Sequence, residues 1–125
     1  MRAVNRAEAV ADMNLGELQA RALRATSLLK AMSNPARLLV LCQLAEGEKS
    51  VGELETVVEI SQSALSQHLA LLRQRGLVKF RRAGQTIFYS LDGTEAPALL
   101  AALYQVYCSK GSLVRKPRGG RREAA

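Results

Sequence analysis

Residues 61–89 read SQSALSQHLALLRQRGLVKFRRAGQTIFY, and this stretch decides the fold. Leucines recur in its first half at the spacing of one helix face, namely Leu65, Leu69 and Leu72. Gly76 then ends the helix, because glycine easily takes the left-handed conformation that closes many helices. Two alternating segments follow, on either side of Ala83 and Gly84. This order predicts a short helix followed by a β-hairpin.

A second short helix is predicted just before this stretch, from Ser50 to Val58. Ser50 and Glu53 have the spacing of a capping box, in which the two residues satisfy each other's free backbone N–H groups. Residues 59–61 leave only a tight connection, which is typical of a helix-turn-helix. The polar side chains of the later helix are then free to meet base edges or phosphates: Gln62, Ser63, Ser66, Gln67 and Arg73. The alternative is an ordinary amphipathic helix and hairpin whose polar side faces water.

The charges separate at the boundary between these two helices. The formal net charge is +7, but residues 109–125 carry +5 of it, as six basic residues against Glu123. Residues 44–60 hold five glutamates and one lysine, whereas residues 61–91 hold five basic residues and no acid. A basic surface over the later helix and the hairpin indicates a nucleic-acid partner. A solvated charge run does not predict such a separation.

The length of 125 residues allows one domain with short ends. We expect an arm at residues 1–13, a winged helix-turn-helix domain for dimerisation and DNA binding at 14–108, and a basic, disordered tail at 109–125. The fold class is mainly α with a small β-hairpin wing. No apolar stretch is long enough to span a bilayer and the amino terminus lacks the regions of a signal peptide, so we expect a cytoplasmic protein.

Three further helices are predicted around this unit. The first begins after Asn14, and the second begins after Ser33 or Asn34 with Pro35 in its first turn. The inward stripe of the second helix is expected to be Leu38, Leu41, Cys42 and Ala45. Thr94 is expected to cap the last helix. The last helix has a wide apolar face, made of Leu99, Leu100, Leu103, Tyr104 and Tyr107.

The first and last helices have more apolar surface than a lone winged helix needs, so we expect them to build a homodimer. The alternative is that both helices only cover the monomer's own core. A two-fold dimer would place two reading helices about one DNA turn, roughly 34 Å, apart. This geometry predicts an inverted-repeat operator in double-stranded DNA.

Three stretches resemble the ArsR family of bacterial winged-helix repressors: NPARLLVLCQL, SQSALSQHLALLRQRGLV and FRRAGQTIFYSL. The resemblance covers residues 15–108 and implies a dimer whose operator affinity falls when an inducer binds. The residues that match the family's reading helix are Gln62, Ser63, Ser66, Gln67 and His68. Wing contacts would fall on Arg81, Arg82 and Gln85. His68 could instead pack beneath the helix as a buried, hydrogen-bonded histidine.

Many members of that family sense metals, and the residues here argue against a metal site. The family's thiolate site has cysteines at the start of the supporting helix, where this chain has Ser50, Val51 and Gly52. Its other site uses histidines and carboxylates on the last helix, which here offers neither histidine nor aspartate. With His68 near DNA only two sulfurs remain, whereas a transition-metal site needs three or four converging donors. We therefore predict no metal and no cofactor.

Cys42 and Cys108 fall where the branch of the family that contains BigR and SqrR has its paired thiols. VGELE at 51–55 and the IFY of the wing add to this resemblance. It implies that reactive sulfur species such as persulfides link the thiols through a disulfide or a chain of sulfur atoms. The link would release DNA and derepress sulfide-detoxification genes. The alternatives are cysteines that pack as inert apolar residues, or another inducer such as a general oxidant or a metal.

An enzyme is the other function class that thiols suggest. The chain has no CxxC pair, no histidine or acidic motif beside either cysteine and no glycine-rich phosphate loop. Its single histidine, His68, lies in the predicted reading helix. We therefore expect a regulator and not an enzyme.

Overall fold

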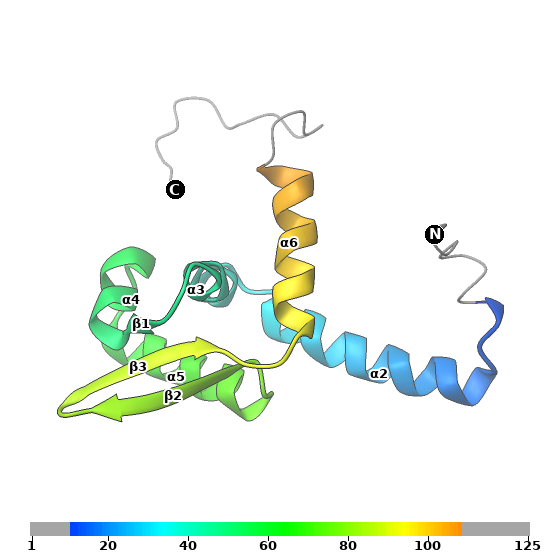
Figure 1. Cartoon of the computed structure of the whole chain (residues 1–125), viewed down its shortest axis with the longest axis horizontal. Coiled ribbons are helices and arrows are strands. Elements are labelled where there is room, and N and C mark those ends of the chain that lie inside the picture. The colour runs from blue at the N-terminus through cyan, green and yellow to red at the C-terminus, as the bar shows by residue number, and fades with distance from the viewer. Residues whose placement is uncertain (1–10, 109–125) are drawn as a thin grey trace.

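The computed structural model describes residues 11–108, which form five helices and a three-stranded sheet (Figure 1). The helices are α2 (Leu15–Met32), α3 (Pro35–Ala45), α4 (Val51–Val58), α5 (Gln62–Gln74) and α6 (Glu95–Tyr107). The strands are β1 (Lys49–Ser50), β2 (Val78–Ala83) and β3 (Thr86–Leu91). Figure 1 shows α3, α4, α5 and the sheet gathered together, with α2 extending to the right and α6 rising above them. The predicted mainly α fold with a hairpin wing is confirmed.

Helices α4 and α5 form the predicted helix-turn-helix. The Ser50 hydroxyl accepts a hydrogen bond from the N–H of Glu53 at 3.1 Å, and the Glu53 carboxylate accepts one from the N–H of Ser50 at 2.7 Å. Glu59 then takes a left-handed conformation, with φ 60°. Ser61 begins α5 by accepting the N–H of Ala64 at 3.1 Å. The leucines that anchor α5 are buried as predicted: Leu65, Leu69 and Leu72.

The hairpin turns at Gly84 and Gln85, between the paired residues Ala83 and Thr86. Gly84 has φ 64°, the positive value that a two-residue hairpin turn requires and that glycine adopts without strain. Strand β1 pairs with β3 and gives the sheet order β1-β3-β2. The sequence did not predict β1, because two residues are too few to show an alternating pattern.

Asparagines begin the two helices that precede the helix-turn-helix. Asn14 caps α2 by accepting the N–H of Glu17 at 2.8 Å. Asn34 caps α3 by accepting the N–H of Arg37 at 3.0 Å, whereas Ser33 ends α2. Of the two caps predicted for α3, Asn34 is therefore the one used.

The predicted inward stripe of α3 is partly wrong. Leu41 is buried, but Cys42 and Ala45 are exposed. Val40 and Leu44 are buried instead, because α4, α5 and β3 pack against that side of the helix. Cys42 is consequently left at the edge of the core, where solvent reaches it.

The predicted cap of α6 is also wrong in detail. Thr94 occupies the N-cap position, but its side chain makes no capping hydrogen bond. Its backbone lies in the right-handed helical region, with φ −113° and ψ −15°, whereas capping side chains usually reach back from an extended backbone. Glu95, in the first turn of α6, forms an exposed ion pair of 2.6 Å with Arg24 of α2.

Two predictions lie largely outside the described part of the chain. Residues 1–10 of the arm and residues 109–125 of the tail are not among the described residues, so these predictions stay predictions. Between residues 11 and 108, no helix combines the length and the apolar character needed to cross a membrane.

Candidate nucleic-acid interface and cysteine pair

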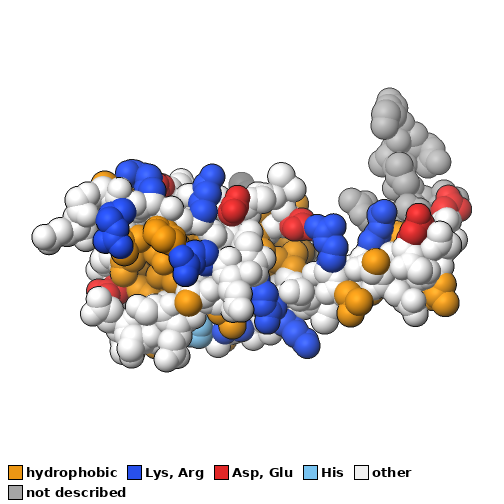
Figure 2. All heavy atoms as spheres, turned by 90° about the horizontal axis from the view of Figure 1, so that it is seen from below, with side chains coloured by type: hydrophobic (Ala, Val, Ile, Leu, Met, Phe, Trp, Pro, Cys, Tyr) orange, Lys and Arg blue, Asp and Glu red, His pale blue; other side chains and the backbone are white. Residues whose placement is uncertain are grey.

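The polar face of α5 is open to solvent. Of the predicted DNA-binding side chains on α5, His68 is half-buried and the other five are exposed: Gln62, Ser63, Ser66, Gln67 and Arg73. They are exposed because the leucines turn the other side of the helix into the core. Figure 2 views the molecule from below and shows basic side chains around an apolar depression on this side.

A groove of about 370 Å³ lies between α5 and the wing. Its polar lining comes from both elements and comprises Gln62, Ser66, Arg73, Arg82 and Gln85. The guanidinium of Arg73 lies 5.0 Å from the centre of the Phe80 ring, which is a cation–π distance. The fold therefore brings five of the predicted DNA-binding residues to one groove with a basic rim.

Phe80 is a candidate contact that the sequence reasoning missed. Its side chain is 41% exposed in the groove, and its ring centre is 5.7 Å from that of Tyr89. Alternation along β2 could have found it, since Phe80 and Arg82 must share one face of the hairpin. An exposed ring on a reading surface suits apolar contact with thymine methyl groups.

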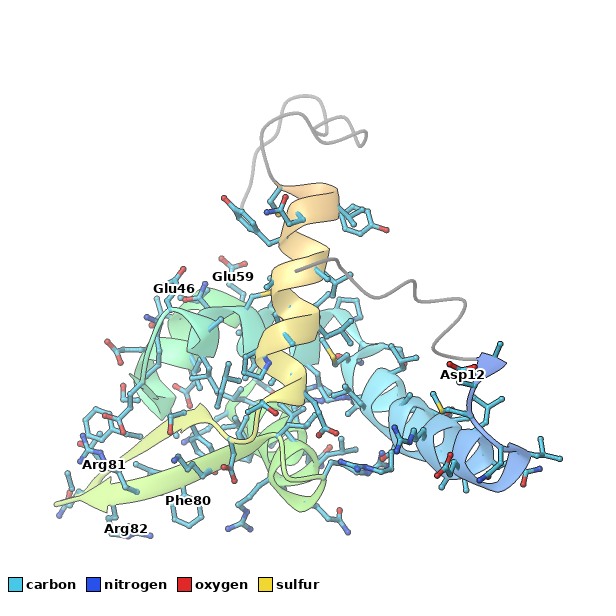
Figure 3. All side chains as sticks on the ribbon, turned by 45° about the vertical axis from the view of Figure 1, so that its right-hand side comes forward. Asp12, Glu46, Glu59, Phe80, Arg81 and Arg82 are labelled. Carbon is cyan, nitrogen blue, oxygen red and sulfur yellow. The ribbon has the colours of Figure 1, made fainter. Side chains whose placement is uncertain are left out.

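Arg81 lies on the opposite face of the hairpin. Figure 3 shows its side chain above the hairpin, whereas Phe80 and Arg82 lie below it. The Arg81 guanidinium donates two hydrogen bonds to the Glu48 carboxylate, at 2.7 and 2.8 Å, and stacks 4.5 Å from the centre of the Phe88 ring. These hydrogen bonds lower the pKa of the Glu48 carboxyl. The predicted wing contacts are thus divided between two faces, with Arg82 and Gln85 at the groove and Arg81 away from it.

His68 is half-buried on the side of α5 that faces α3. Arg37 of α3 lies 3.4 Å from its Nδ1, and because arginine has no acceptor, Arg37 must be the donor. Arg37 also donates to the carbonyls of Ala31 at 2.6 Å and Lys30 at 3.2 Å, which end α2. His68 is therefore hydrogen-bonded, but it is only half-buried, so its contact with DNA stays a prediction.

Both cysteines are free thiols that solvent reaches. Cys42 lies on α3, and Cys108 ends α6, where its N–H donates to the carbonyl of Tyr104 at 2.8 Å. Partial burial raises the pKa of the Cys42 thiol, and the nearby charges of Cys108 and Glu46 raise it further. Because α3 packs against α6, two cysteines that are far apart in the sequence lie on neighbouring helices.

Among residues 11–108, the structure has no group of three or more histidine, cysteine, aspartate or glutamate side chains that could hold a metal ion.

Comparison with known proteins assigns the family. A family model described as "Bacterial regulatory protein, arsR family" matches residues 34–79. The transcriptional activator HlyU of Vibrio cholerae is 52% identical over 98 residues, which are 78% of this chain and 91% of that protein. Its reduced structure matches with a TM-score of 0.73 and 50% identity, covering 76% of this chain and all of that one.

Two further solved structures share the fold. The transcriptional repressor BigR from Xylella fastidiosa matches with a TM-score of 0.71 and 44% identity, over 78% of this chain and all of that one. A homodimeric winged helix-turn-helix DNA-binding domain from Mycobacterium bovis matches with a TM-score of 0.63 and 29% identity, over 74% and 85% of the two chains. Together with the helix-turn-helix, the wing and the basic groove, these matches show that the chain belongs to the ArsR family of bacterial regulatory proteins and is a DNA-binding transcriptional regulator.

Proposed function

We propose that this chain is a homodimeric repressor that leaves its operator when reactive sulfur species bridge Cys42 and Cys108. The observation that carries the proposal is the placement of two accessible thiols on the packed helices α3 and α6, near enough for Cys108 to raise the pKa of Cys42. Its relatives support a regulatory role: BigR is described as a repressor and HlyU as an activator. These roles are regulatory, which supports a regulator rather than an enzyme.

The proposed chemistry balances without a further oxidant. One cysteine thiolate attacks the outer sulfur of a persulfide RSSH and releases the thiol RSH, which leaves a persulfide on the cysteine. The second thiolate attacks the inner sulfur of that persulfide and releases H₂S. The two cysteines lose two electrons in total, and the sulfur that leaves as H₂S gains them. Two more persulfide molecules would each insert one sulfur and release one thiol, giving a four-sulfur bridge.

The bridge would act on the reading helix through α3. Helix α3 packs against α4 and α5 on one side and against α6 on another, so a tether from Cys42 to Cys108 constrains the reading unit relative to α6. If α2 and α6 form the dimer, this constraint changes the distance or tilt between the two reading helices. A hundredfold loss of affinity requires the bridge to favour the weak-binding arrangement by about 3 kcal/mol.

The apolar surface of α2 and α6 supports a second copy of the chain as the partner. A shallow groove of about 260 Å³ between α2, α3 and α6 is lined almost wholly by apolar side chains, namely Leu29, Met32, Ser33, Leu38, Leu99 and Leu103. Large apolar side chains elsewhere on α2 and α6 are more than half exposed in the single chain: Leu15, Leu23, Tyr104 and Tyr107. Burial of such a surface would stabilise a dimer, whose domain we place at residues 14–108.

The direct test combines intact mass with DNA affinity on one sample. After incubation with glutathione persulfide, we expect the loss of two free thiols, a mass gain of whole sulfur atoms if a chain forms, and weaker binding to the operator. Oxidised glutathione serves as the control that cannot insert sulfur. Weaker binding with both thiols intact would indicate a different inducer. Bridged thiols with unchanged operator affinity would show that the cysteines do not control DNA binding.

Alkylation of Cys42 is expected to accelerate as the pH rises through and beyond 9.0, the ordinary pKa of the group, because only the thiolate reacts and the pKa of Cys42 is raised. Glu46→Gln removes one of the charges that raise this pKa. In the Cys108→Ser background, we expect it to accelerate alkylation at neutral pH by about two- to fivefold. Iodoacetamide labelling followed by mass spectrometry measures the rate. Glu17→Gln, on α2, is the matched control, and equal rates for the two glutamine variants would contradict the assignment.

Arg82 and Gln67 are expected to contribute to DNA binding in different ways. Arg82→Ala should lower affinity on all sequences and reduce the slope of log affinity against log salt by about one, because it removes a phosphate contact. Gln67→Ala should leave that slope unchanged and weaken discrimination between bases by about 1–3 kcal/mol. Fluorescence anisotropy with operator and random duplexes at several salt concentrations measures both. Equal effects of the two variants on both duplexes would contradict this division.

A further inference from the structure

Two neighbouring arginines of β2 have different surroundings. Arg82 opens onto the groove between α5 and the wing, whereas Arg81 points to the other side of the hairpin (Figure 3). The register explains this, since Arg82 pairs with Ile87, which lines the groove, and Arg81 pairs with Phe88, which does not. Cross-strand partners share one face, so the two arginines face opposite ways.

We propose that Arg81 is a positioning residue that clamps the wing to the helix-turn-helix through Glu48, rather than a residue that contacts DNA. The Glu48–Arg81 clamp consists of two parallel hydrogen bonds and the stacking of the guanidinium on Phe88. The proposal rests on the groove being the DNA interface, and it does not depend on the sulfur response.

The clamp connects the wing to the beginning of α4 by a very short path. Glu48 directly precedes β1, whose residues Lys49 and Ser50 pair with Tyr89 and Phe88 of β3. Ser50 is also the N-cap of α4. A change in the tilt of the hairpin would therefore pull on the residues that start the supporting helix. Among residues 11–108, the β3 edge of the hairpin pairs with the two residues of β1, and α3 and α4 also pack against β3.

The geometry of the clamp makes it directional. Two N–H to oxygen bonds to one carboxylate restrict the orientation of the guanidinium, whose central carbon lies over the Phe88 ring. A lysine could keep the charge but could not reproduce both bonds. A phosphate group that bound side-on to the same pair of donors, Nε and Nη2 of Arg81, would have to displace the Glu48 carboxylate.

The test compares variants of the clamp with a variant of the groove in the full chain. The probe is the duplex that the parent chain selects from a random-sequence library, and affinity is measured by anisotropy across a range of KCl concentrations. We expect Arg81→Ala and Glu48→Gln to weaken binding by similar factors, about three- to tenfold, with an unchanged salt slope. Arg82→Ala should instead reduce the slope by about one.

Glu48→Gln is the sharpest of these variants. It removes a negative charge near DNA and frees Arg81, so a DNA-contacting Arg81 predicts tighter binding, whereas the clamp predicts weaker binding. The double variant should be no weaker than either single variant, because both remove the same contact. The charge swap Glu48→Arg with Arg81→Glu should restore part of the affinity, and Arg81→Lys should bind as weakly as Arg81→Ala.

Tighter binding by Glu48→Gln, or a salt slope lowered by one in Arg81→Ala, would overturn the proposal, as would parent-like affinity in both. The circular dichroism spectrum of each variant establishes whether it is folded. If Arg81→Ala is not folded, the affinity of the charge swap is compared with that of Glu48→Gln instead. An unchanged slope in Arg82→Ala would count against the groove interface. The comparison of Glu48→Gln with Arg81→Ala would still decide the role of Arg81.

Discussion

Cys42→Ser and Cys108→Ser are each expected to abolish the response of DNA affinity to persulfide. The parent chain should lose about 100-fold in operator affinity when treated, near the upper end of common allosteric couplings. Either variant keeps one thiol, which can carry a persulfide but cannot form an internal bridge between α3 and α6. We therefore expect less than about a twofold change in the variants. Anisotropy titrations before and after treatment with glutathione persulfide measure the response.

The untreated variants provide the control for this result. Both thiols are exposed in the reduced chain, so serine should leave folding and basal affinity close to those of the parent. Treated samples need mass analysis under non-reducing conditions, because a bridge between two copies of a variant would imitate the internal bridge. A parent-like response in both single variants would show that the signal does not pass through the two cysteines.

Tyr104→Glu is expected to dissociate the dimer and to weaken operator binding by about 100-fold or more. The reason is that a monomer binds one half-site, whereas a dimer binds two at once. The side chain of Tyr104 is 59% exposed on α6, so its replacement should change the stability of the single chain little. In a dimer through α2 and α6, a glutamate would be buried without a partner. Leu23→Glu, on α2, should have the same effect. Sedimentation velocity reports the dimer, and anisotropy reports the affinity.

Val57→Glu is the matched control for this experiment. Val57 is 45% exposed on α4, away from α2 and α6, so the same type of substitution should leave both the oligomeric state and the affinity unchanged. A Tyr104→Glu chain that remains dimeric would place the interface elsewhere. A monomer that binds the operator as tightly as the parent would contradict the prediction that two copies of the chain bind two half-sites together.

Much of the fold was predictable because its signals are local. The leucine spacing of α5, the capping box of α4 and the glycine turn of the wing each depend on residues within a few positions of one another. The exposure of Gln62, Ser66 and Arg73 followed directly from the apolar face opposite them. The buried face of α3 was less predictable, because LLVLCQL offers apolar residues in nearly every direction and only the neighbouring helices select one.

Arg81 and Arg82 show where local pattern ends and tertiary contact begins. They are chemically identical and adjacent, and alternation alone puts them on opposite faces of a strand. The packing of the sheet decides which face lies against α5. It also decides that the other face meets Glu48, which is 33 residues earlier than Arg81 in the chain. Likewise, the sequence supplies two thiols, but only the packing of α3 against α6 places them on neighbouring helices. Short-range sterics and hydrogen bonds determine each element within its own residues, whereas contacts between distant side chains exist only after the elements have packed around a common core.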